Sequence, residues 1–471
     1  MPGASRCFQD SCGRPGFAAV TLTPRRLART LAWAALSVAL GLLAAACQGG
    51  GGKVGLVAHG AAHRPTATVT IITGNLAATS AGPAGVRGGG LPTQAGSHQV
   101  VAVDRRPDLG ARVSVTGGTL SRVIATTGSG KAVPGKLGTG GTGWHSDWAL
   151  APAQTYRVTA TAVTPGGGKV VATRTFRTLT PRRTFTASTS IASRQVMGVG
   201  MPIMVTFSQA ITDKTQVERA LQIRASKRVI GAWYWMDSHA VWFRTKKFWP
   251  AHTRVTLAAH LEGVRGAPGM YGAANLTQRF RIGNSLVAVA SASSHIMKVW
   301  WKGHFMGNWP ISTGQPGDDT PNGHYLSFAM GNPVDMNSAS FGVMPGDPGY
   351  YNVLVYDSVQ FTYSGDYVHS APWSVGQQGF VNVSHGCVNV GPANAAWYYA
   401  HSMLGDPITI VGSPLKGTWG DGWTIWFLPW RKLIAGSATG EAAVASARGS
   451  RFVAPENITP NRMRTRALTR N

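Results

Sequence analysis

One cysteine in the body of this chain stands in a setting suited to nucleophilic chemistry. Cys387 follows Ser384-His385-Gly386 and precedes Val388-Asn389. A thiol attacks a carbonyl efficiently only when a nearby base or cation favours its thiolate, and the resulting tetrahedral intermediate needs hydrogen-bond donors for its oxyanion. Gly386 allows a tight backbone turn that aims successive N–H groups at one point. The pattern predicts an acyl-transferring cysteine, although a lone cysteine can also be buried and inert.

The base for this thiol must come from another part of the chain. We expect His385 to be a poor direct base for so near a neighbour in the sequence. His369 lies eighteen residues before the cysteine (387 − 369), within Val368-His369-Ser370-Ala371-Pro372-Trp373. We therefore expect His369 to be the base.

The N-terminus predicts export. Arg25, Arg26 and Arg29 precede an apolar stretch, 31–46, that ends in small residues before Cys47. This is typical of a secretory signal peptide, here residues 1–47, although an uncleaved membrane anchor remains open. The ending Leu-Ala-Ala-Ala-Cys also resembles the lipobox of bacterial lipoproteins. That resemblance implies that Cys47 is lipidated and that this lipid anchors the protein to the membrane.

The four cysteines of the chain then divide unevenly. Cys7, Cys12 and Cys47 lie in the leader or at its end, so Cys387 remains as the one thiol of the exported body. Exported proteins usually pair their cysteines, and an unpaired one indicates a reactive thiol.

The composition of the chain limits the classes of fold that can position these residues. The chain has 471 residues, of which 44% are hydrophobic and 13% are charged, which predicts several folded domains rather than a disordered chain. Few charges with much Gly, Thr and Val favour a mainly β fold and exclude a coiled coil or a multi-span membrane protein. The net charge of +26 suits attraction to anionic wall polymers or a solvated surface with a basic tail. With no nucleic-acid motif in an exported chain, we expect no nucleic-acid partner.

A repeat organises the first half of the body. Pro152-Ala153-Gln154-Thr155 recurs as Pro250-Ala251-His252-Thr253, an offset of 98 (250 − 152), and each copy leads into a Val-Thr strand. A period near this length with Gly-rich turns predicts two immunoglobulin-like β-sandwiches. We place a Gly-rich linker at 48–66 and the two sandwiches at 67–180 and 181–283. Four tryptophans of the second module are expected in its core rather than on a sugar-binding platform: Trp233, Trp235, Trp242 and Trp249.

The second half predicts a β-rich catalytic domain at 284–412. Its one convincing helix runs from Pro392 to Leu404, with Gly405 as its stop. A Trp-rich segment at 413–436 is expected to pack back on this domain, and 437–471 to form a basic, disordered tail.

The residues around Cys387 and His369 resemble a known family, the L,D-transpeptidases with a YkuD-type catalytic domain. The motifs that carry the resemblance are His369 with Ser384-His385-Gly386-Cys387-Val388-Asn389, Ile311-Ser312-Thr313-Gly314 with Thr320-Pro321-Asn322-Gly323, Tyr363 to Ser374, and the Trp-rich C-terminal segment. Two immunoglobulin-like modules before the catalytic domain resemble the actinobacterial branch of the family.

The resemblance implies a role for each matching residue. Cys387 is the nucleophile and His369 the base, which Ser370 orients mainly through its backbone carbonyl. The backbone N–H groups of His385, Gly386 and Cys387 form the oxyanion hole, helped by the Tyr351 hydroxyl. The implied substrate-contacting residues are Tyr351, Ser364, Gly365, Asn389, Met336 and Trp373. Phe341 stands in the lid where close relatives have Tyr, and Gln315 where many members have Lys, which puts lid hydrogen bonding and substrate detail in doubt.

The implied reaction is a two-step acyl transfer in cell-wall biogenesis that forms 3→3 cross-links between peptidoglycan stem peptides. The partners are a tetrapeptide donor and a diamino-acid acceptor, and carbapenem β-lactams are implied covalent inhibitors. Two alternatives stay open: water as acceptor, which makes the enzyme an L,D-carboxypeptidase, and a non-catalytic wall-binding lipoprotein scaffold. No cofactor is required. We expect no metal, because His304, His324 and His401 lack ligand spacing.

Overall fold

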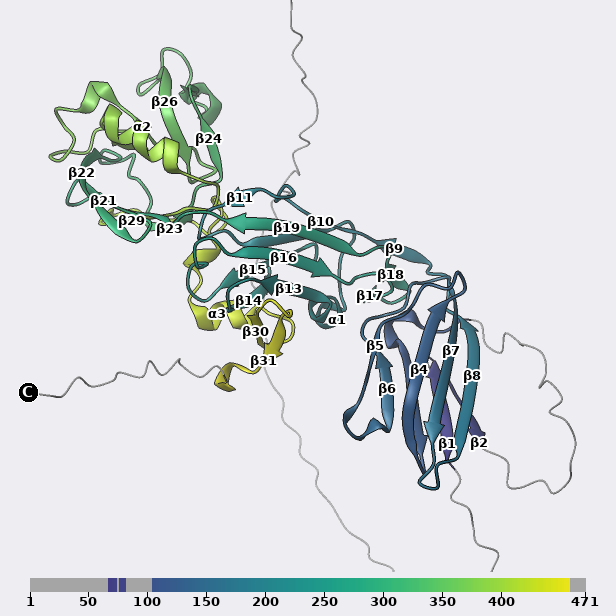
Figure 1. Ribbon diagram of the computed structural model, residues 1–471. Helices are drawn as coiled ribbons and strands as arrows, with labels where there is room; N and C mark the ends of the chain where they lie inside the picture. Colours follow the sequence, from purple (N-terminus) through teal and green to yellow (C-terminus); the bar gives the residue numbers. More distant parts are fainter. Residues whose placement is uncertain (1–66, 74–75, 82–103, 458–471) are drawn as a thin grey trace, which may run out of the picture. The chain divides into compact units, whose positions relative to one another are not determined.

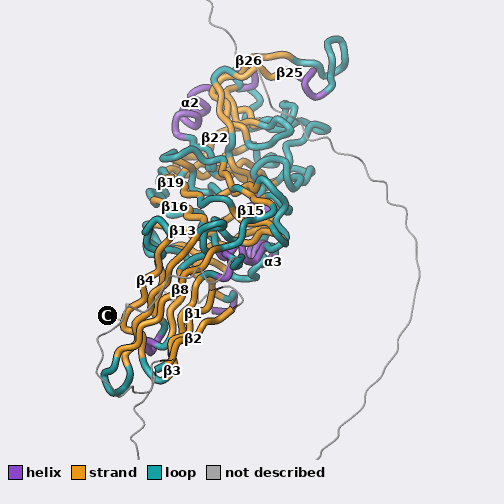
Figure 2. Tube along the Cα trace, turned by 90° about the vertical axis from the view of Figure 1, so that its right-hand side faces the viewer, coloured by secondary structure: helices purple, strands orange, loops and turns teal. Residues whose placement is uncertain are grey.

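The computed structural model describes residues 67–73, 76–81 and 104–457, all within one unit of the chain, residues 63–471. Strands dominate and helices are short (Figures 1 and 2), which confirms the prediction of a mainly β protein. The predicted leader 1–47, Cys47 and the linker 48–66 lie outside the described residues. Within the described residues, no helix is long and apolar enough to cross a membrane.

The first module pairs its strands into two sheets. Alternate residues of its long strands are buried, so each strand gives one face to the core and one to solvent, as in sandwich packing. The five-stranded sheet has the order β2 (Leu76–Ala81), β1 (Thr68–Thr73), β3 (Ala111–Thr116), β6 (Gly143–Ser146) and β5 (Gly135–Leu137). The three-stranded sheet has the order β4 (Thr119–Thr127), β7 (Thr155–Val163) and β8 (Lys169–Arg177).

The second module contains three sheets and the short helix α1 (Lys214–Arg219). The largest sheet has the order β10-β12-β15-β14-β30-β31, and its first four strands are β10 (Ala187–Thr189), β12 (Ile203–Phe207), β15 (Ala240–Thr245) and β14 (Val229–Trp235). The four-stranded sheet has the order β11 (Val196–Met197), β19 (Leu276–Ile282), β16 (Arg254–Ala259) and β13 (Leu221–Ala225). The smallest has the order β17 (Arg265–Ala267), β18 (Met270–Gly272) and β9 (Arg183–Phe185).

The two modules have the same strand pairing where the sequence repeats. Each recurring segment leads into a strand, β7 or β16, and each of these pairs antiparallel with the strand that closes its module, β8 or β19. Trp233, Trp235 and Trp249 are buried in the core of the second module, as expected, whereas Trp242 is only partly buried.

The third domain is built on one continuous set of strands. Their order is β23 (Gly323–Leu326), β29 (Pro407–Val411), β20 (Leu286–Ser291), β21 (Ile296–Trp301), β22 (His304–Ser312), β28 (Val388–Val390), β27 (Tyr367–Ser370), β26 (Asn352–Gln360) and β24 (Ala329–Gly331), while β25 (Val334–Asn337) pairs with β26. β27 and β28 are parallel neighbours near the middle of this order.

Helix α2 (Pro392–His401) packs against β26 and β27. Pro392 opens the helix, where its missing N–H costs nothing. The helix ends three residues earlier than predicted, because Ser402 takes an extended conformation with φ −73° and ψ 146°.

The C-terminal segment contacts two domains rather than one. The ring of Phe427 packs on Tyr325 of the third domain, with 5.0 Å between centroids. The indole N–H of Trp426 donates to the Gly200 carbonyl of the second module at 2.8 Å, and helix α3 (Trp430–Ala435) contacts β14. The prediction named only the catalytic domain as the packing partner of this segment, and it left out the contacts with the second module.

The prediction of a disordered tail is wrong for residues 437–457. β30 (Ala442–Ala445) pairs with β14, and β31 (Arg451–Val453) pairs with β30, so the chain end extends the largest sheet of the second module. All four residues of β30 are buried, and this burial favours order although Ala has a low β propensity. Residues 458–471 lie outside the described part.

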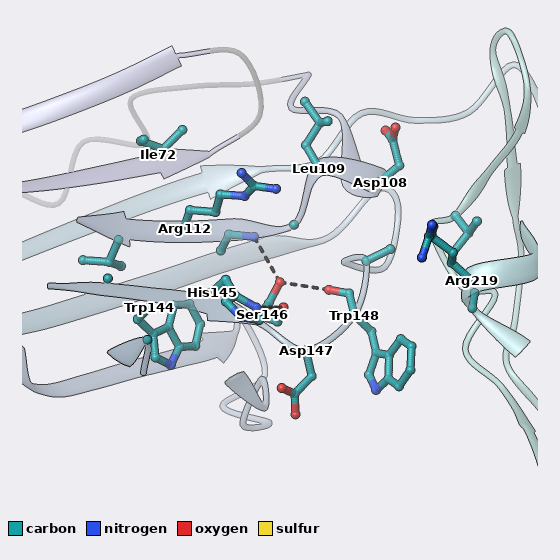
Figure 3. A pocket seen from close by; sticks show the side chains of 18 of the residues that line it. Ile72, Asp108, Leu109, Arg112, Trp144, His145, Ser146, Asp147, Trp148 and Arg219 are labelled. Atoms are coloured by element: carbon teal, nitrogen blue, oxygen red, sulfur yellow. Dashed lines mark hydrogen bonds between the residues drawn. The ribbon is translucent and has the colours of Figure 1, made fainter. Parts of the chain in front are cut away.

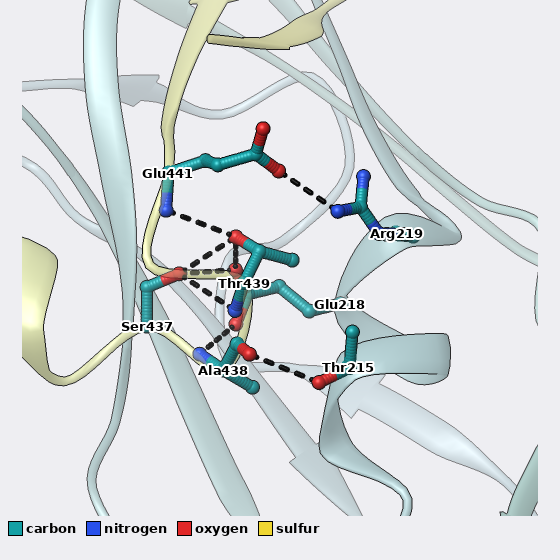
Figure 4. A network of polar contacts seen from close by, with 7 residues as sticks. All are labelled: Thr215, Glu218, Arg219, Ser437, Ala438, Thr439 and Glu441. Carbon is teal, nitrogen blue, oxygen red and sulfur yellow. Dashed lines mark hydrogen bonds and ion pairs between the residues drawn. The ribbon is translucent and has the colours of Figure 1, made fainter. Parts of the chain in front are cut away.

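A buried carboxylate anchors this returning segment (Figure 4). Glu218 of α1 is fully buried. It accepts hydrogen bonds from the Trp235 indole at 2.9 Å, the Ser437 hydroxyl at 2.5 Å, the Ala438 N–H at 2.7 Å and the Thr439 hydroxyl at 2.7 Å. Four donors offset the cost of burying the charge.

Candidate active site

Two large hollows differ in the chemistry of their walls. One, of about 830 Å³, is lined by residues of the sandwich modules, and Ser146 at its wall accepts from the Ala111 N–H and donates to the Trp148 carbonyl (Figure 3). Those contacts connect backbone segments, and none of the described residues that line this hollow is a cysteine. The other, of about 670 Å³, lies in the third domain and is called the cleft below. The predicted site residues that line the cleft are Met336, Tyr351, Ser364, Gly365, His369, Trp373, His385, Cys387 and Asn389.

Parallel pairing of β27 and β28 brings the predicted base and nucleophile into this cleft. Val368 and Val388 are register partners and are buried in the core of the domain. The next pair, His369 and Asn389, therefore points to the opposite face, toward the cleft. Cys387 directly precedes β28, so the same alternation gives it the same face as Asn389.

A backbone carbonyl holds the His369 ring. Its Nδ1 lies 3.0 Å from the Ser370 carbonyl oxygen, which can only accept, so Nδ1 carries the proton and Nε2 is left as the basic nitrogen. The ring is 2% exposed, and this burial lowers its pKa, while the hydrogen bonds to Ser370 and Asn389 oppose the shift. The imidazole is thus neutral and oriented at neutral pH.

The Cys387 thiol is also neutral. Its Sγ lies 3.7 Å from the Gly365 carbonyl, to which the S–H donates. Burial, with a smaller contribution from the nearby Asp366 carboxylate, raises the pKa of Cys387 to about 12, and a hydrogen bond from the Tyr367 backbone opposes this. The site therefore rests with a neutral thiol and a neutral imidazole in the same cleft.

Asp366 is the main feature of the site that sequence reasoning missed. Its side chain is 8% exposed, and the Thr362 hydroxyl donates to its Oδ2 at 2.8 Å. Burial, followed by the charge of Asp421, raises the pKa of Asp366 to about 6, against the hydrogen bonds from Thr362 and Ser364. Asp366 lies within the Tyr363 to Ser374 motif, but sequence reasoning assigned it no role, because a single carboxylate between Gly365 and Tyr367 has no periodic or spaced partner.

Gly386 is required by its contact with this carboxylate. Its φ is +123°, and a Cβ there would lie 2.4 Å from Asp366 Oδ1. Two hydrogen bonds hold the backbone around Gly386. The Thr320 hydroxyl donates to the Gly386 carbonyl at 2.5 Å, and the Ser384 hydroxyl donates to the Cys387 carbonyl at 2.6 Å.

One expected donor of the oxyanion hole has a hydrogen-bond partner within the chain. The Gly386 N–H donates to the Ser384 hydroxyl at 3.2 Å, so it is already engaged. Among the described residues, the N–H groups of His385 and Cys387 have no hydrogen-bond partner and remain available. The Tyr351 ring lies 4.9 Å from the His385 ring, and burial, then the charges of Cys387, Asp366 and Asp318, raises its pKa.

The remaining predicted residues divide between the cleft wall and its support. Trp373 lies 5.9 Å from the His369 ring, between centroids. Asn389 is buried and donates to the Ser374 hydroxyl at 3.1 Å. Gln315 lines the cleft and donates to Asp318 at 2.8 Å. Phe341 ends the 3-10 turn Ser338–Phe341, and its side chain lies outside the described part of the structure.

In the described part, no group of three or more His, Cys, Asp or Glu could hold a metal ion.

Comparisons with known proteins identify relatives of this chain. The family of bacterial Ig domains matches residues 102–265, and the L,D-transpeptidase catalytic domain matches residues 285–410. L,D-transpeptidase 2 of Mycobacterium tuberculosis is 36% identical over 335 residues, which are 70% of this chain and 81% of the relative. L,D-transpeptidase 1 of the same species is 38% identical over 226 residues, 48% of this chain and 84% of the relative. A solved structure of an LD transpeptidase in complex with imipenem is 38% identical and covers 48% of this chain and 97% of that chain, with a TM-score of 0.41.

Proposed function

Because this chain belongs to the L,D-transpeptidase family, we propose that it forms 3→3 cross-links between peptidoglycan stem peptides in cell-wall biogenesis. The observation that supports this most is the convergence of Cys387 and His369 on one cleft, with His369 Nδ1 held by the Ser370 carbonyl. That arrangement leaves Nε2 as the basic nitrogen, which would take the thiol proton during the reaction.

In the first step, Cys387 takes the acyl group of the donor stem. Nε2 of His369 removes the thiol proton as Sγ attacks the carbonyl of the third, diamino-acid residue. The tetrahedral intermediate collapses, the bond to the terminal D-Ala breaks, and the leaving amine takes the proton from His369. A neutral resting thiol suits this route, since the proton moves during the attack rather than before it.

In the second step, the side-chain amine of another stem attacks the thioester. The new C–N bond forms, the C–S bond breaks, and sulfur recovers a proton through His369. The N–H groups of His385 and Cys387 would donate to the oxyanion in both steps, with the Tyr351 hydroxyl nearby. The cleaved peptide bond supplies the driving force, so no cofactor is needed.

Location follows from the leader. We place the protein on the outer face of the cytoplasmic membrane, held by a lipid on Cys47, with its net charge of +26 drawn to anionic wall polymers. Mass analysis of the mature N-terminus tests this: a diacylglycerol adduct on Cys47 is expected, and a mature chain that retains residues 1–46 would contradict it.

The activity is tested by intact-protein mass spectrometry of the full chain with meropenem, beside Cys387→Ala. We expect one adduct on the parent and none on the variant, because the site should form a stable acyl-enzyme with carbapenems. Incubation with a tetrapeptide stem should then yield a cross-linked dimer. Release of the tripeptide alone would indicate an L,D-carboxypeptidase, and the absence of any adduct on a folded parent would favour a wall-binding scaffold.

A further inference from the structure

The cleft has the opposite charge to the chain that contains it. The protein has 44 Lys and Arg against 18 Asp and Glu. Among the described residues, however, Asp318 and Asp366 line the cleft and no Lys or Arg does. Asp318 is exposed at the rim, whereas Asp366 is buried close to the nucleophile. The two carboxylates make the cleft attractive to cations.

Asp366 has no cation of its own. No ion pair within the described part of the chain includes it, and its Oδ2 is held by the neutral Thr362 hydroxyl. Its Oδ1 faces Gly386, one residue before Cys387. A buried carboxylate without a counter-charge lowers stability, so its presence beside a reactive centre calls for a compensating role.

The first half-reaction does not supply that role. Negative charge at Asp366 disfavours the thiolate of Cys387, and it opposes the oxyanion that develops next to the same backbone turn. For attack by sulfur, a neutral side chain at this position would be better. The second half-reaction differs, because its nucleophile arrives with a positive charge while sulfur is bound in an uncharged thioester.

We propose that Asp366 determines acceptor specificity, its carboxylate holding the primary ammonium group of the incoming amine beside the Cys387 thioester. This inference rests on the proposed function. The acceptor enters as R–NH3⁺, pairs with Asp366 and loses one proton to solvent. Its nitrogen lone pair forms the C–N bond, the C–S bond breaks with its electron pair going to sulfur, and His369 moves the second N–H proton to the sulfur.

The test separates a charged acceptor from an uncharged one. The full-length protein receives a tetrapeptide donor whose side-chain amine is acetylated, so that the donor brings no ammonium group of its own. Acyl transfer is then followed to a diamino-acid stem, which is an ammonium at neutral pH, and to hydroxylamine, which is uncharged. Asp366→Asn keeps the shape and an acceptor for Thr362. Asp335→Asn makes the same charge change at an exposed position that does not line the cleft.

We expect Asp366→Asn to raise the KM for the ammonium acceptor about tenfold, because a charge-assisted hydrogen bond is lost. Its KM for hydroxylamine should stay at the parental value, its acylation by meropenem should not become slower, and Asp335→Asn should behave as the parent. An unchanged KM for the ammonium acceptor, or an equal rise for hydroxylamine, would overturn the assignment. If the parent thioester passes only to water, the transpeptidase function itself is wrong, and this inference with it.

Discussion

Asp421 accepts two hydrogen bonds from Ser364, one from its backbone N–H at 2.8 Å and one from its hydroxyl at 2.7 Å. The two residues are 57 apart in sequence, and Asp421 belongs to the Trp-rich C-terminal segment. Ser364 lies in the active-site loop, residues 362–366, which also carries the Gly365 carbonyl that accepts from Cys387. The C-terminal segment thereby holds one wall of the cleft.

Replacing Asp421 should loosen this loop. We expect Asp421→Ala to slow acylation by meropenem about three- to tenfold, since each lost hydrogen bond is worth roughly 1 kcal/mol. Asp421→Asn keeps one acceptor oxygen and should recover part of the rate. Stopped-flow fluorescence of acylation measures both variants. Equal rates for the parent and Asp421→Ala would show that the loop is held by its other contacts.

Ser370 should matter less than its position in the motif suggests. Its carbonyl, not its hydroxyl, contacts His369, and alanine retains that carbonyl. Ser370→Ala should therefore keep acylation within about tenfold of the parent, whereas Cys387→Ala and His369→Ala should lose it almost completely. Total loss in a Ser370→Ala protein with parental circular dichroism would contradict the backbone assignment.

The coupling of Asp366 to Cys387 predicts a pH-dependent effect on thiol reactivity. Burial raises the pKa of Asp366 to about 6, so the carboxyl is neutral below that pH and charged above it. The charge raises the pKa of Cys387, so Asp366→Asn should speed alkylation by iodoacetamide about threefold or more above pH 6. Below pH 6 the two proteins should converge. A constant ratio across the whole pH range would mean that charge is not the cause.

Glu218 should be more important for stability than the ion pair beside it. Four donors converge on this buried carboxylate, two on each oxygen, and Glu218→Gln replaces one of the two acceptor oxygens with an NH2 group. We expect the free energy of opening of β30 to fall by about 2–4 kcal/mol. The half-exposed Arg219–Glu441 pair (2.9 Å) should contribute less than about 1 kcal/mol, so Glu441→Gln is the matched control. Hydrogen exchange of residues 442–445 measures both, and similar protection in the two variants would count against the anchor.

Much of the site could be predicted because its central residues are close in sequence. His369 lies on β27, and Cys387 directly precedes β28, its parallel neighbour. Each has a partner close in sequence: the Ser370 carbonyl contacts the His369 ring, and Gly386 forms the turn before the thiol. The mainly β class and the repeated modules followed from composition and from a 98-residue offset, which are properties of the chain alone.

Contacts between distant segments could not be predicted in the same way. Asp421 reaches Ser364, β30 pairs with β14 more than 200 residues earlier, and Asp366 meets Gly386 across the turn before β28. None of these pairs has a characteristic spacing, because each depends on how sheets and loops pack after the strands have formed. Charge and burial act through space: Asp366 is an ordinary acidic residue in the sequence, and only the tertiary structure removes it from water and sets it beside the nucleophile.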